Sequence, residues 1–381
     1  MRAEMTPRQR LLTVLNGGIP DHVPVIPDMS NMIPARLTGK PFWDIYLHND
    51  PPLYAAYANA AKHFGFDGWY QAYDAISFQQ ANAPTRTSQI ISRSDERIVE
   101  RAAFHTAKGD LWEEITYMRA DPPTVTIKKI KDFEADFEKV KCFYGDIVSH
   151  DASRLESYRE MCGEDGVFTL VVGYPGMHSW SGWFHDGLQG AVYAYADFPE
   201  CFDEWAALEH KFVLRQAEIM LSYKPDLLLL GASGTLTLST PELVRKYSLP
   251  TIQQVCRMAK QAGVPTMLHS CGKSMAFFDM LVNETDLDCI NPLEEPPMGD
   301  VNLAEVKKLY GDRICLMGNL HTSEVMLMGS PDDVEAAAKK AIDDAAKNGR
   351  FLLSTGDQCG RDTPDTNIFK LVEVAKTYGQ Y

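Results

Sequence analysis

The sequence predicts an α/β chain folded as a (β/α)8 TIM barrel, with an N-terminal helical extension and an inserted β-rich cap. Short apolar runs, typical of strands buried on both faces, alternate with amphipathic stretches of helix length along most of the chain. Such alternation builds right-handed β–α–β units around a parallel sheet, and eight units close into a barrel. An open doubly wound sheet is the alternative, but no glycine-rich phosphate loop follows the first predicted strand.

The N-terminal extension is predicted as a helix by its boundary residues. Thr6 can cap it, Pro7 suits its first position and Gln9 completes a capping box, while Gly17 and Gly18 end it. The eight predicted strands then follow in chain order at residues 23–28, 66–73, 167–174, 227–231, 266–271, 287–293, 313–319 and 350–356. The clearest predicted helices between them cover residues 52–64, 201–223, 241–262 and 331–348.

One segment, residues 74–166, interrupts this alternation. It contains polar, β-like stretches at residues 89–92, 97–100 and 124–127 and a helix near residues 153–162. We expect these stretches to form antiparallel excursions that make a cap over the barrel mouth. The whole chain, residues 1–381, is then one barrel domain that includes the cap.

Composition narrows the class of partner and the compartment. The 381 residues are 45% hydrophobic, enough for one large core, and the formal net charge is −15. That charge argues against a nucleic-acid or anionic-membrane partner and fits a small molecule or a protein with basic patches. The N-terminus has no apolar signal segment, no apolar run is long enough to cross a membrane, and the eight cysteines are scattered. These features predict a cytoplasmic protein with reduced thiols, some of them free to be metal ligands.

Barrel enzymes place their active sites at the C-terminal ends of the strands, where this chain has a histidine and two cysteines. His269 and Cys271 are two residues apart on a strand and therefore face the same side, and Cys359 follows the last strand. One imidazole and two thiolates suit Zn²⁺, and three protein ligands leave the open position of a catalytic site. Glu294 or Glu295 is a candidate for that fourth position. A His-x-Cys pair alone is more often core packing, but a third soft ligand at the same mouth favours a metal.

Further polar and aromatic residues stand at or near the same strand ends. His178 and His321 are candidate general acids, or they hydrogen-bond their own loops. The aromatic side chains would line a pocket for a flat ring, such as a methoxylated aromatic, or would pack the cap on the barrel, and Asn319 would orient substrate or cap its loop. The candidate substrate-binding residues are Asp28, Tyr70, Tyr73, Tyr174, Met177, Trp180 and Asn319, and Trp183 is a further aromatic candidate.

Four segments resemble the uroporphyrinogen decarboxylase superfamily. Residues 263–272 (GVPTMLHSCG) resemble its PxxxHxCG segment and residues 318–320 its GNL motif, while residues 173–177 correspond loosely to its GxxGxP turn. Residues 355–367 resemble its last strand and loop. The likeness covers most of the chain, is strongest from about residue 225 onward, and implies the same TIM barrel.

Two chemistries occur in that superfamily. Its metal-free decarboxylases carry an early, arginine-rich segment, whereas the equivalent residues 28–34 here contain no arginine. A substrate with eight carboxylates would need several Arg or Lys contacts. Its corrinoid-linked methyltransferases hold zinc with one histidine and two cysteines, a pattern that His269, Cys271 and Cys359 match.

The resemblance therefore implies a zinc-dependent methyltransferase that moves a methyl group between a thiol or a methoxylated compound and the cobalt of a corrinoid. A metal-free decarboxylase and a non-catalytic zinc or corrinoid-carrier-binding module are the alternatives. No Asp-x-His-x-x-Gly segment is present, so we expect the cobalamin to arrive on a separate corrinoid protein, steered by acidic residues of the cap. A homo-oligomer stays open.

Overall fold

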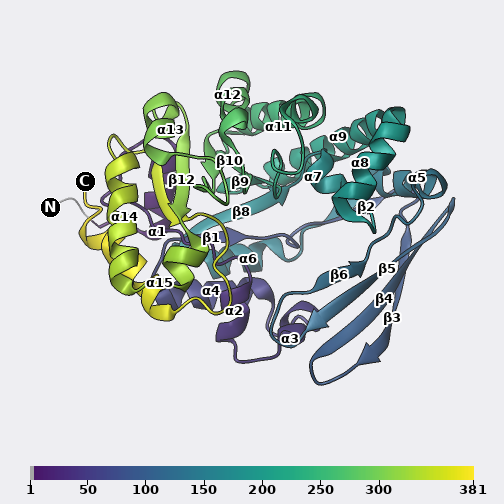
Figure 1. Ribbon diagram of the computed structural model, residues 1–381, viewed down its shortest axis with the longest axis horizontal. Helices are drawn as coiled ribbons and strands as arrows, with labels where there is room; N and C mark the ends of the chain where they lie inside the picture. The colour runs from purple at the N-terminus through teal and green to yellow at the C-terminus, as the bar shows by residue number, and fades with distance from the viewer. Residues whose placement is uncertain (1–3) are drawn as a thin grey trace.

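The structure, a computed structural model, describes residues 4–381 and contains a curled, parallel, seven-stranded sheet (Figure 1). Its strand order, β1-β8-β9-β10-β11-β12-β13, follows the order of the chain, so each crossover joins neighbouring strands, as in a barrel. The strands are β1 (Gly68–Gln71), β8 (Gly166–Val172), β9 (Leu227–Gly231), β10 (Thr266–His269), β11 (Cys289–Asn291), β12 (Cys315–Leu320) and β13 (Phe351–Thr355).

The first predicted strand takes the eighth place in the barrel, between β13 and β1. Val25 forms a parallel bridge with Leu353 of β13, and the amide of Asp67, which directly precedes β1, donates to the Val25 carbonyl at 2.9 Å. The pairing is limited to this bridge because Pro24 and Pro27 on either side have no amide hydrogen to donate. The predicted eight-unit barrel is confirmed, with its first strand shorter than expected.

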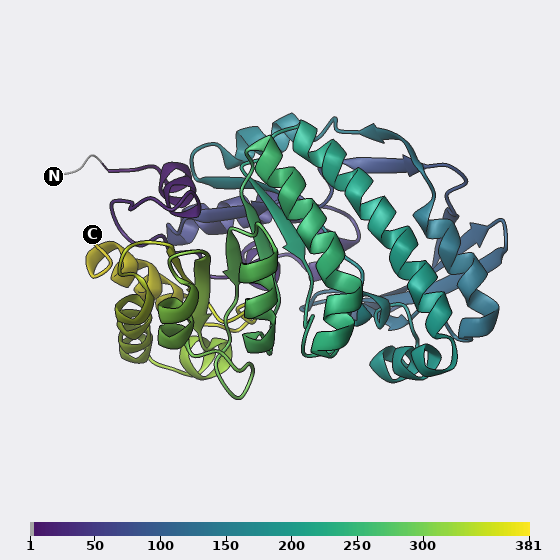
Figure 2. The ribbon, with the colours of Figure 1, turned by 90° about the horizontal axis from the view of Figure 1, so that it is seen from above.

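Helices surround the strands on the outside, and the long helices α9 and α11 lie side by side (Figure 2). The helices of the barrel and its N-terminal extension are α1 (Pro7–Leu15), α2 (Met32–Leu37), α3 (Phe42–Tyr46), α4 (Leu53–Phe64), α7 (Met177–Trp180), α8 (Gly187–Asp197), α9 (Pro199–Ser222), α10 (Pro241–Leu243), α11 (Leu249–Ala262), α12 (Met275–Glu284), α13 (Leu303–Tyr310), α14 (Pro331–Ala345) and α15 (Asp365–Thr377).

Helix 241–262, predicted as continuous, is divided in the structure. A π-helical turn (Val244–Ser248) separates α10 from α11, and a second π-helical turn (Thr322–Leu327) follows β12. Pro250, in the first turn of α11, has no amide hydrogen to bond back to the preceding turn, which explains the break.

Helix α1 covers the end of the barrel opposite its C-terminal mouth. Leu11, Val14 and Leu15 pack on inward-facing strand residues that include Cys289 and Cys315. These two cysteines are completely buried and belong to the core at this end of the barrel. This end of the barrel is therefore closed by core packing.

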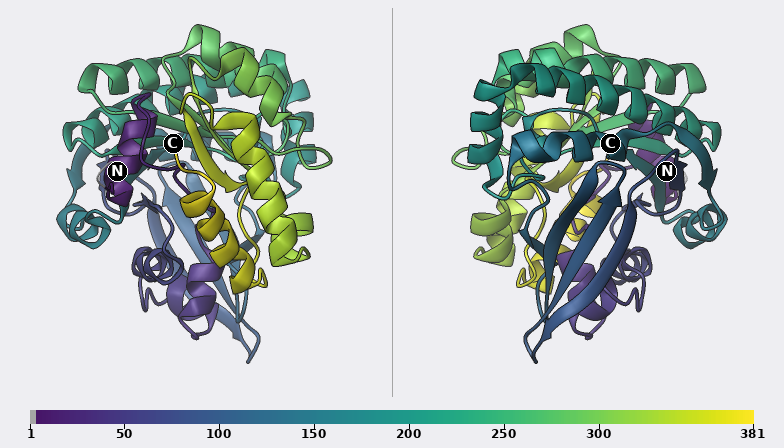
Figure 3. Two further views of the ribbon diagram at one scale, coloured as in Figure 1. Left: turned by 90° about the vertical axis from the view of Figure 1, so that its left-hand side faces the viewer. Right: turned by 90° about the vertical axis from the view of Figure 1, so that its right-hand side faces the viewer.

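The inserted cap is antiparallel, as predicted. In both views of Figure 3 its strands extend away from the barrel. Arg361, in the loop after β13, links the cap to the barrel because its guanidinium donates to the carbonyl of Ala120 and, at 3.1 Å, to Asp121. Its elements are β2 (Ser77–Gln80) paired with β7 (Ile147–Asp151), the sheet of β3 (Thr85–Arg93), β4 (Arg97–Thr106), β5 (Gly109–Met118) and β6 (Thr124–Ile127), α5 (Phe133–Lys141), a 3-10 turn (Cys142–Tyr144) and α6 (Leu155–Cys162). Within residues 4–381, no helix has both the length and the apolar character needed to span a membrane.

Candidate metal centre

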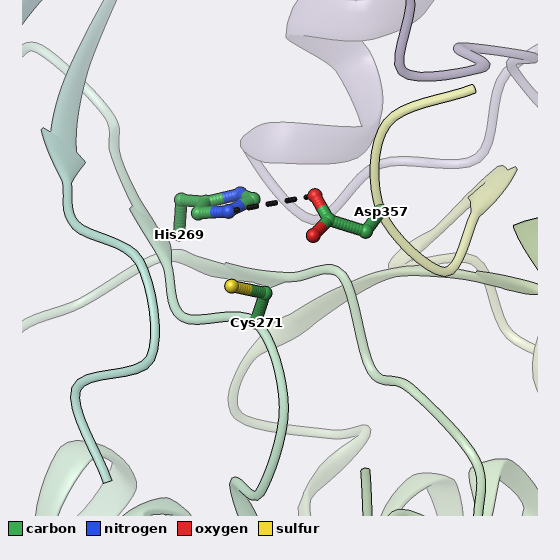
Figure 4. Close-up of side chains that lie close together, drawn as sticks. All are labelled: His269, Cys271 and Asp357. Carbon is green, nitrogen blue, oxygen red and sulfur yellow. Dashed lines mark ion pairs between the residues drawn. The ribbon is translucent and has the colours of Figure 1, made fainter. Parts of the chain in front are cut away.

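Three side chains from two strand ends meet at the C-terminal mouth of the barrel (Figure 4). His269 is the last residue of β10, Cys271 lies two residues further on, and Asp357 follows β13. One ligand atom of each lies within 4.8 Å of the others, and His269 Nε2 is 3.8 Å from Asp357 Oδ1. Two ligands of a tetrahedral zinc are roughly 3.4 Å apart, so the three groups are close to the spacing that one zinc ion requires.

The turn that presents Cys271 depends on Gly272. Its φ of +79° is in the left-handed region, and a Cβ at this position would lie 2.1 Å from the Thr237 hydroxyl oxygen. That hydroxyl in turn accepts a hydrogen bond from the Lys273 amide at 2.8 Å. The glycine of the His-x-Cys-Gly motif is therefore required by the close approach of the neighbouring loop.

Asp357 has an uncommon backbone conformation. Its φ is +139°, a value that residues other than glycine rarely adopt. The hydroxyl of Thr355 donates to the Asp357 carbonyl at 2.7 Å and helps to hold this turn. Residues in such conformations concentrate at functional sites, and here the conformation directs the carboxylate toward His269.

Cys359, the third ligand expected from the sequence, is not one of the three clustered residues. Its side chain is completely buried two residues beyond Asp357, and its amide donates to the carbonyl of Asp28 at 2.9 Å. Burial, with a smaller contribution from the Asp28 charge, raises the pKa of the Cys359 thiol to about 12. Its role as a ligand stays a prediction, and Asp357 is the residue that sequence reasoning did not choose.

The two glutamates considered for the fourth position differ in placement. Glu294 is buried beside the cluster, where its carboxylate accepts a hydrogen bond from the Gly272 amide. Burial raises the pKa of Glu294, and the charge of Asp357 adds to the effect. Glu295 faces outward and accepts a hydrogen bond from Asn319 Nδ2 at 3.2 Å. The structure therefore favours Glu294 over Glu295 as a neighbour of the cluster.

The electrostatics of the cluster suit a cation. Burial, followed by the charge of Asp357, raises the pKa of the Cys271 thiol to about 11, so the thiol is neutral near pH 7 without a cation. A bound metal ion would displace that proton and stabilise the thiolate. A thiol, an imidazole and a carboxylate are donors that zinc accepts, so the residues present fit a zinc ion with an open position.

A cavity of about 420 Å³ opens directly onto the cluster, and we call it the mouth cavity. A second cavity of about 240 Å³ adjoins it, and the two share Ser30, Trp69, Gln71 and Tyr73. The mouth cavity is lined by those four residues and by Asp28, Asn31, Val171, Leu229, Gly231, Ala232, Ser233, His269, Asp357 and Gln358. The second cavity is lined by the same four and by Ile45, Tyr46, Asn49, Pro52, Leu53, Tyr54, Tyr57, Asp74 and Tyr158.

Of the candidate substrate-binding residues, Asp28 and Tyr73 line the mouth cavity. Asp28 is almost completely buried, and burial raises its pKa, an effect that His269 opposes. Tyr70 is buried among the rings of Tyr54 and Tyr57, which themselves line the second cavity. Tyrosines 54 and 57 were missed because their three-residue spacing on α4 is also the spacing of helix core residues.

The aromatic residues after β8 belong to the core beneath the cap. Trp180 is completely buried, stacks on Trp205 and donates from Nε1 to Glu209 at 2.8 Å. Trp183 packs edge-on against the same Trp205 ring. Tyr174 is buried with its hydroxyl on Thr235 at 2.7 Å, and Met177 is buried in the same region of the core as Trp180. Their placement agrees with the packing interpretation that the sequence left open.

The two additional histidines lie in structural surroundings. His178 packs against the ring of Tyr174 and is half-buried, and burial lowers its pKa to about 4. His321 Nδ1 accepts hydrogen bonds from the amides of Ser323 and Glu324 at 3.2 and 3.0 Å, so it caps the following helical turn. Neither ring lines the mouth cavity, as far as the described residues define it.

Comparisons with known proteins agree with this architecture. Residues 198–378 match the family model "Uroporphyrinogen decarboxylase (URO-D)". The chain is 26% identical over 267 residues to the methylcobamide:CoM methyltransferase MtbA of Methanosarcina mazei, an overlap of 67% of this chain and 72% of the relative. It is 30% identical over 141 residues to the methylcobamide:CoM methyltransferase MtaA of Methanosarcina barkeri, covering 37% of this chain and 38% of the relative.

A solved structure, described as a methyltransferase from Methanosarcina mazei, shares the fold with a TM-score of 0.64 at 17% identity. The superposition covers 98% of this chain and 99% of that one, so the likeness includes the cap as well as the barrel.

The fold and the cluster thus define a barrel protein with a candidate catalytic metal site at its C-terminal mouth. The chain resembles the uroporphyrinogen decarboxylase superfamily, with a family match over residues 198–378, and its resemblance to the corrinoid-dependent methyltransferase branch is confirmed.

Proposed function

We propose that the protein is a zinc-dependent methyltransferase that moves a methyl group between a small substrate, a thiol or a methoxylated compound, and the cobalt of a corrinoid held by a separate protein. The observation that carries this proposal is the His269–Cys271–Asp357 cluster, which faces the mouth cavity at the position of a barrel active site. The relatives named as methylcobamide:CoM methyltransferases supply the reaction class.

The residues at the barrel mouth would have two kinds of role, as metal ligands and as substrate contacts. His269 and Cys271 would hold the metal, with Asp357 or Cys359 as the third ligand and Glu294 beside them. A zinc ion in this place supplies Lewis acidity, which lowers the pKa of a thiol or improves an ether oxygen as a leaving group. Asp28 and Tyr73 would contact the substrate in the mouth cavity.

A metal-free decarboxylase of the same fold is the second candidate, and the lining of the site counts against it. Among the described residues, no lysine or arginine lines either cavity. A polycarboxylate substrate would bring several negative charges next to Asp28 and Asp357 without a cation to offset them.

The proposal is tested by zinc content and methyl transfer together. Elemental analysis of the wild-type chain, purified without chelator, should give about one zinc per chain. His269→Ala and Cys271→Ser should lose most of it, and comparison of Asp357→Asn with Cys359→Ser identifies the third ligand. Cys256→Ser is the matched control and should keep its zinc, because the Cys256 thiol on α11 is as completely buried as that of Cys359.

The same variants are then mixed with methylcobalamin and a panel of thiols, and with cob(I)alamin and methoxyarenes, while the corrinoid absorbance is recorded. Transfer by the wild type and the Cys256→Ser control, but not by the zinc-depleted variants, is the expected result. A wild-type chain that binds no zinc after reconstitution, or that transfers no methyl group in either direction, contradicts the proposal.

A further inference from the structure

The second cavity has a distinctive wall, made largely of tyrosine. Five tyrosines line it, from α3, α4, the loop after β1 and α6, and we call it the tyrosine pocket: Tyr46, Tyr54, Tyr57, Tyr73 and Tyr158. It adjoins the mouth cavity through four shared residues, so a ligand in it can extend toward His269. Apart from Tyr73, which also lines the mouth cavity, no residue of this pocket has a role in the function proposed above.

Most of the tyrosine hydroxyls in this pocket are occupied by the protein itself. The Tyr54 hydroxyl donates to the carbonyl of Tyr158 at 2.9 Å, and the Tyr57 hydroxyl accepts from the Trp69 amide at 2.8 Å. The Tyr158 hydroxyl donates to Asp74 at 2.9 Å. The aromatic rings are therefore what these residues have left to offer a ligand, and the hydrogen bonds hold the rings in place.

The walls are also packed against one another before any ligand binds. The rings of Tyr54 and Tyr158 stack at a centroid distance of 4.2 Å and an interplanar angle of 7°. Tyr54 and Tyr57 also contact the ring of Tyr70 at 5.6 and 5.2 Å. A preformed aromatic wall favours a flat, rigid ligand, because little side-chain entropy is lost on binding.

The charged residues that line the two cavities restrict the class of ligand further. The carboxylates that line them are Asp28, Asp74 and Asp357, and Asp74 is neutralised by Arg154 at 2.7 Å. Among the described residues, neither cavity is lined by a lysine or an arginine. Coenzyme M, the thiol in the names of the relatives, is an alkanesulfonate with a full negative charge, and these cavities offer that charge no cationic side chain.

We propose that the tyrosine pocket binds the uncharged aromatic ring of a methyl aryl ether and directs its methoxy group into the mouth cavity. This inference rests on the proposed methyl transfer and names its substrate class. In the transfer that this binding serves, the O–CH3 bond breaks with both electrons left on the oxygen, which takes up a proton. The methyl group forms its new bond to the reduced cobalt, Co(I), of the corrinoid.

Binding of the ring can be measured without catalysis. Isothermal titration calorimetry compares 2-methoxyphenol, 4-methoxybenzenesulfonate, coenzyme M and tetramethylammonium on the full-length chain. Leu53→Trp, which places a larger side chain in the wall of the pocket, should weaken 2-methoxyphenol binding by about tenfold or more. Leu309→Trp, at an exposed leucine of α13 that lines neither cavity, is the matched control and should bind as the wild type does. Tyr73→Ala, at a side chain that is 65% exposed and therefore dispensable for folding, should also weaken binding.

The outcomes separate this inference from the proposed function. The pocket is supported if the wild type prefers 2-methoxyphenol to 4-methoxybenzenesulfonate and to coenzyme M, and if Leu53→Trp and Tyr73→Ala lose this preference. That result holds even if the chain binds no zinc and transfers no methyl group. Tighter binding of coenzyme M, or binding of 2-methoxyphenol that both variants leave unchanged, overturns it. Tighter binding of tetramethylammonium in the same pocket overturns the uncharged class, because an aromatic wall also attracts quaternary ammonium ions.

Discussion

Replacement of Arg10 by methionine should destabilise the barrel where it closes. The Arg10 guanidinium is buried, with 4% of its side chain exposed, and bonds Asp21 at 2.7 and 3.0 Å, Asp67 at 2.5 Å and the carbonyl of Met5 at 2.7 Å. Asp67, also buried, uses its other oxygen to accept from the Val25 amide at 2.8 Å. Arg10 thus neutralises the carboxylate that joins the first strand to β1.

The expected loss follows from the burial of that carboxylate. Methionine keeps the apolar stem of Arg10 but leaves the Asp67 charge facing only one amide and no cation. Removal of one partner of a buried ion pair costs about 3–5 kcal/mol, and we expect a loss of that size in the free energy of unfolding. A double variant, Arg10→Met with Asp67→Asn, should recover at least about 1 kcal/mol, because the amide oxygen can still accept from Val25 without a buried charge.

Arg8 on the same helix provides the matched control. It also makes a two-bond pair with an aspartate, Asp226, at 2.6 and 3.0 Å, but 36% of its side chain is exposed. Arg8→Met should therefore cost at most about 1 kcal/mol. Urea unfolding curves of the three variants and the wild type give the comparison. Equal losses for Arg10→Met and Arg8→Met, or no recovery in the double variant, would refute the argument that the buried charge controls the closure.

Two further predictions concern Glu209 and Gly272. Burial raises the pKa of Glu209 from 4.5 to about 7, so the native state holds the Glu209 proton more tightly than the unfolded chain does. The free energy of unfolding should therefore fall by up to about 3 kcal/mol as the pH rises from 4.5 to about 7. In Glu209→Gln this contribution should vanish, and urea unfolding at pH 5 and pH 8 checks it; an unchanged pH dependence contradicts it. Gly272→Ala should lower both stability, by about 1–3 kcal/mol, and zinc content, because its Cβ would meet Thr237 at 2.1 Å. Gly263→Ala, with a similar φ of +70° and nothing within 4 Å, should show only the smaller backbone cost of about 1 kcal/mol and keep its zinc.

The elements that sequence reasoning placed well are those with local signals. Helix α1 begins at Pro7 with the capping box of Thr6 and Gln9, as its boundary residues predict. Strand β9, predicted at residues 227–231, has those bounds in the structure because its four consecutive leucines are all buried, as expected for a strand covered on both faces. The first strand was predicted too long, since the effect of its two prolines on pairing depends on neighbouring strands that are far away in sequence.

The site was partly predictable for a related reason. His269 is the last residue of β10 and Cys271 lies two residues beyond it, and the structure brings the two side chains together, as their spacing predicted. The tyrosine pocket combines residues from four separate elements, so no local pattern distinguishes its members from core tyrosines. Only the packing of α3, α4 and α6 on the barrel brings these rings together.

The third ligand shows where reasoning from strand periodicity ends. Asp357 and Cys359 are also two residues apart, but they lie in the loop after β13, where the alternation of a strand no longer applies. The φ of +139° at Asp357 breaks the extended path, and the structure turns that carboxylate toward His269 while Cys359 is buried behind Asp28. The chemical preference of zinc for thiolate favours Cys359, whereas the backbone favours Asp357. Because the backbone conformation is set by the Thr355 hydroxyl and the cap contacts of the same loop, the choice between the two ligands depends on tertiary structure and not on the spacing of the motif.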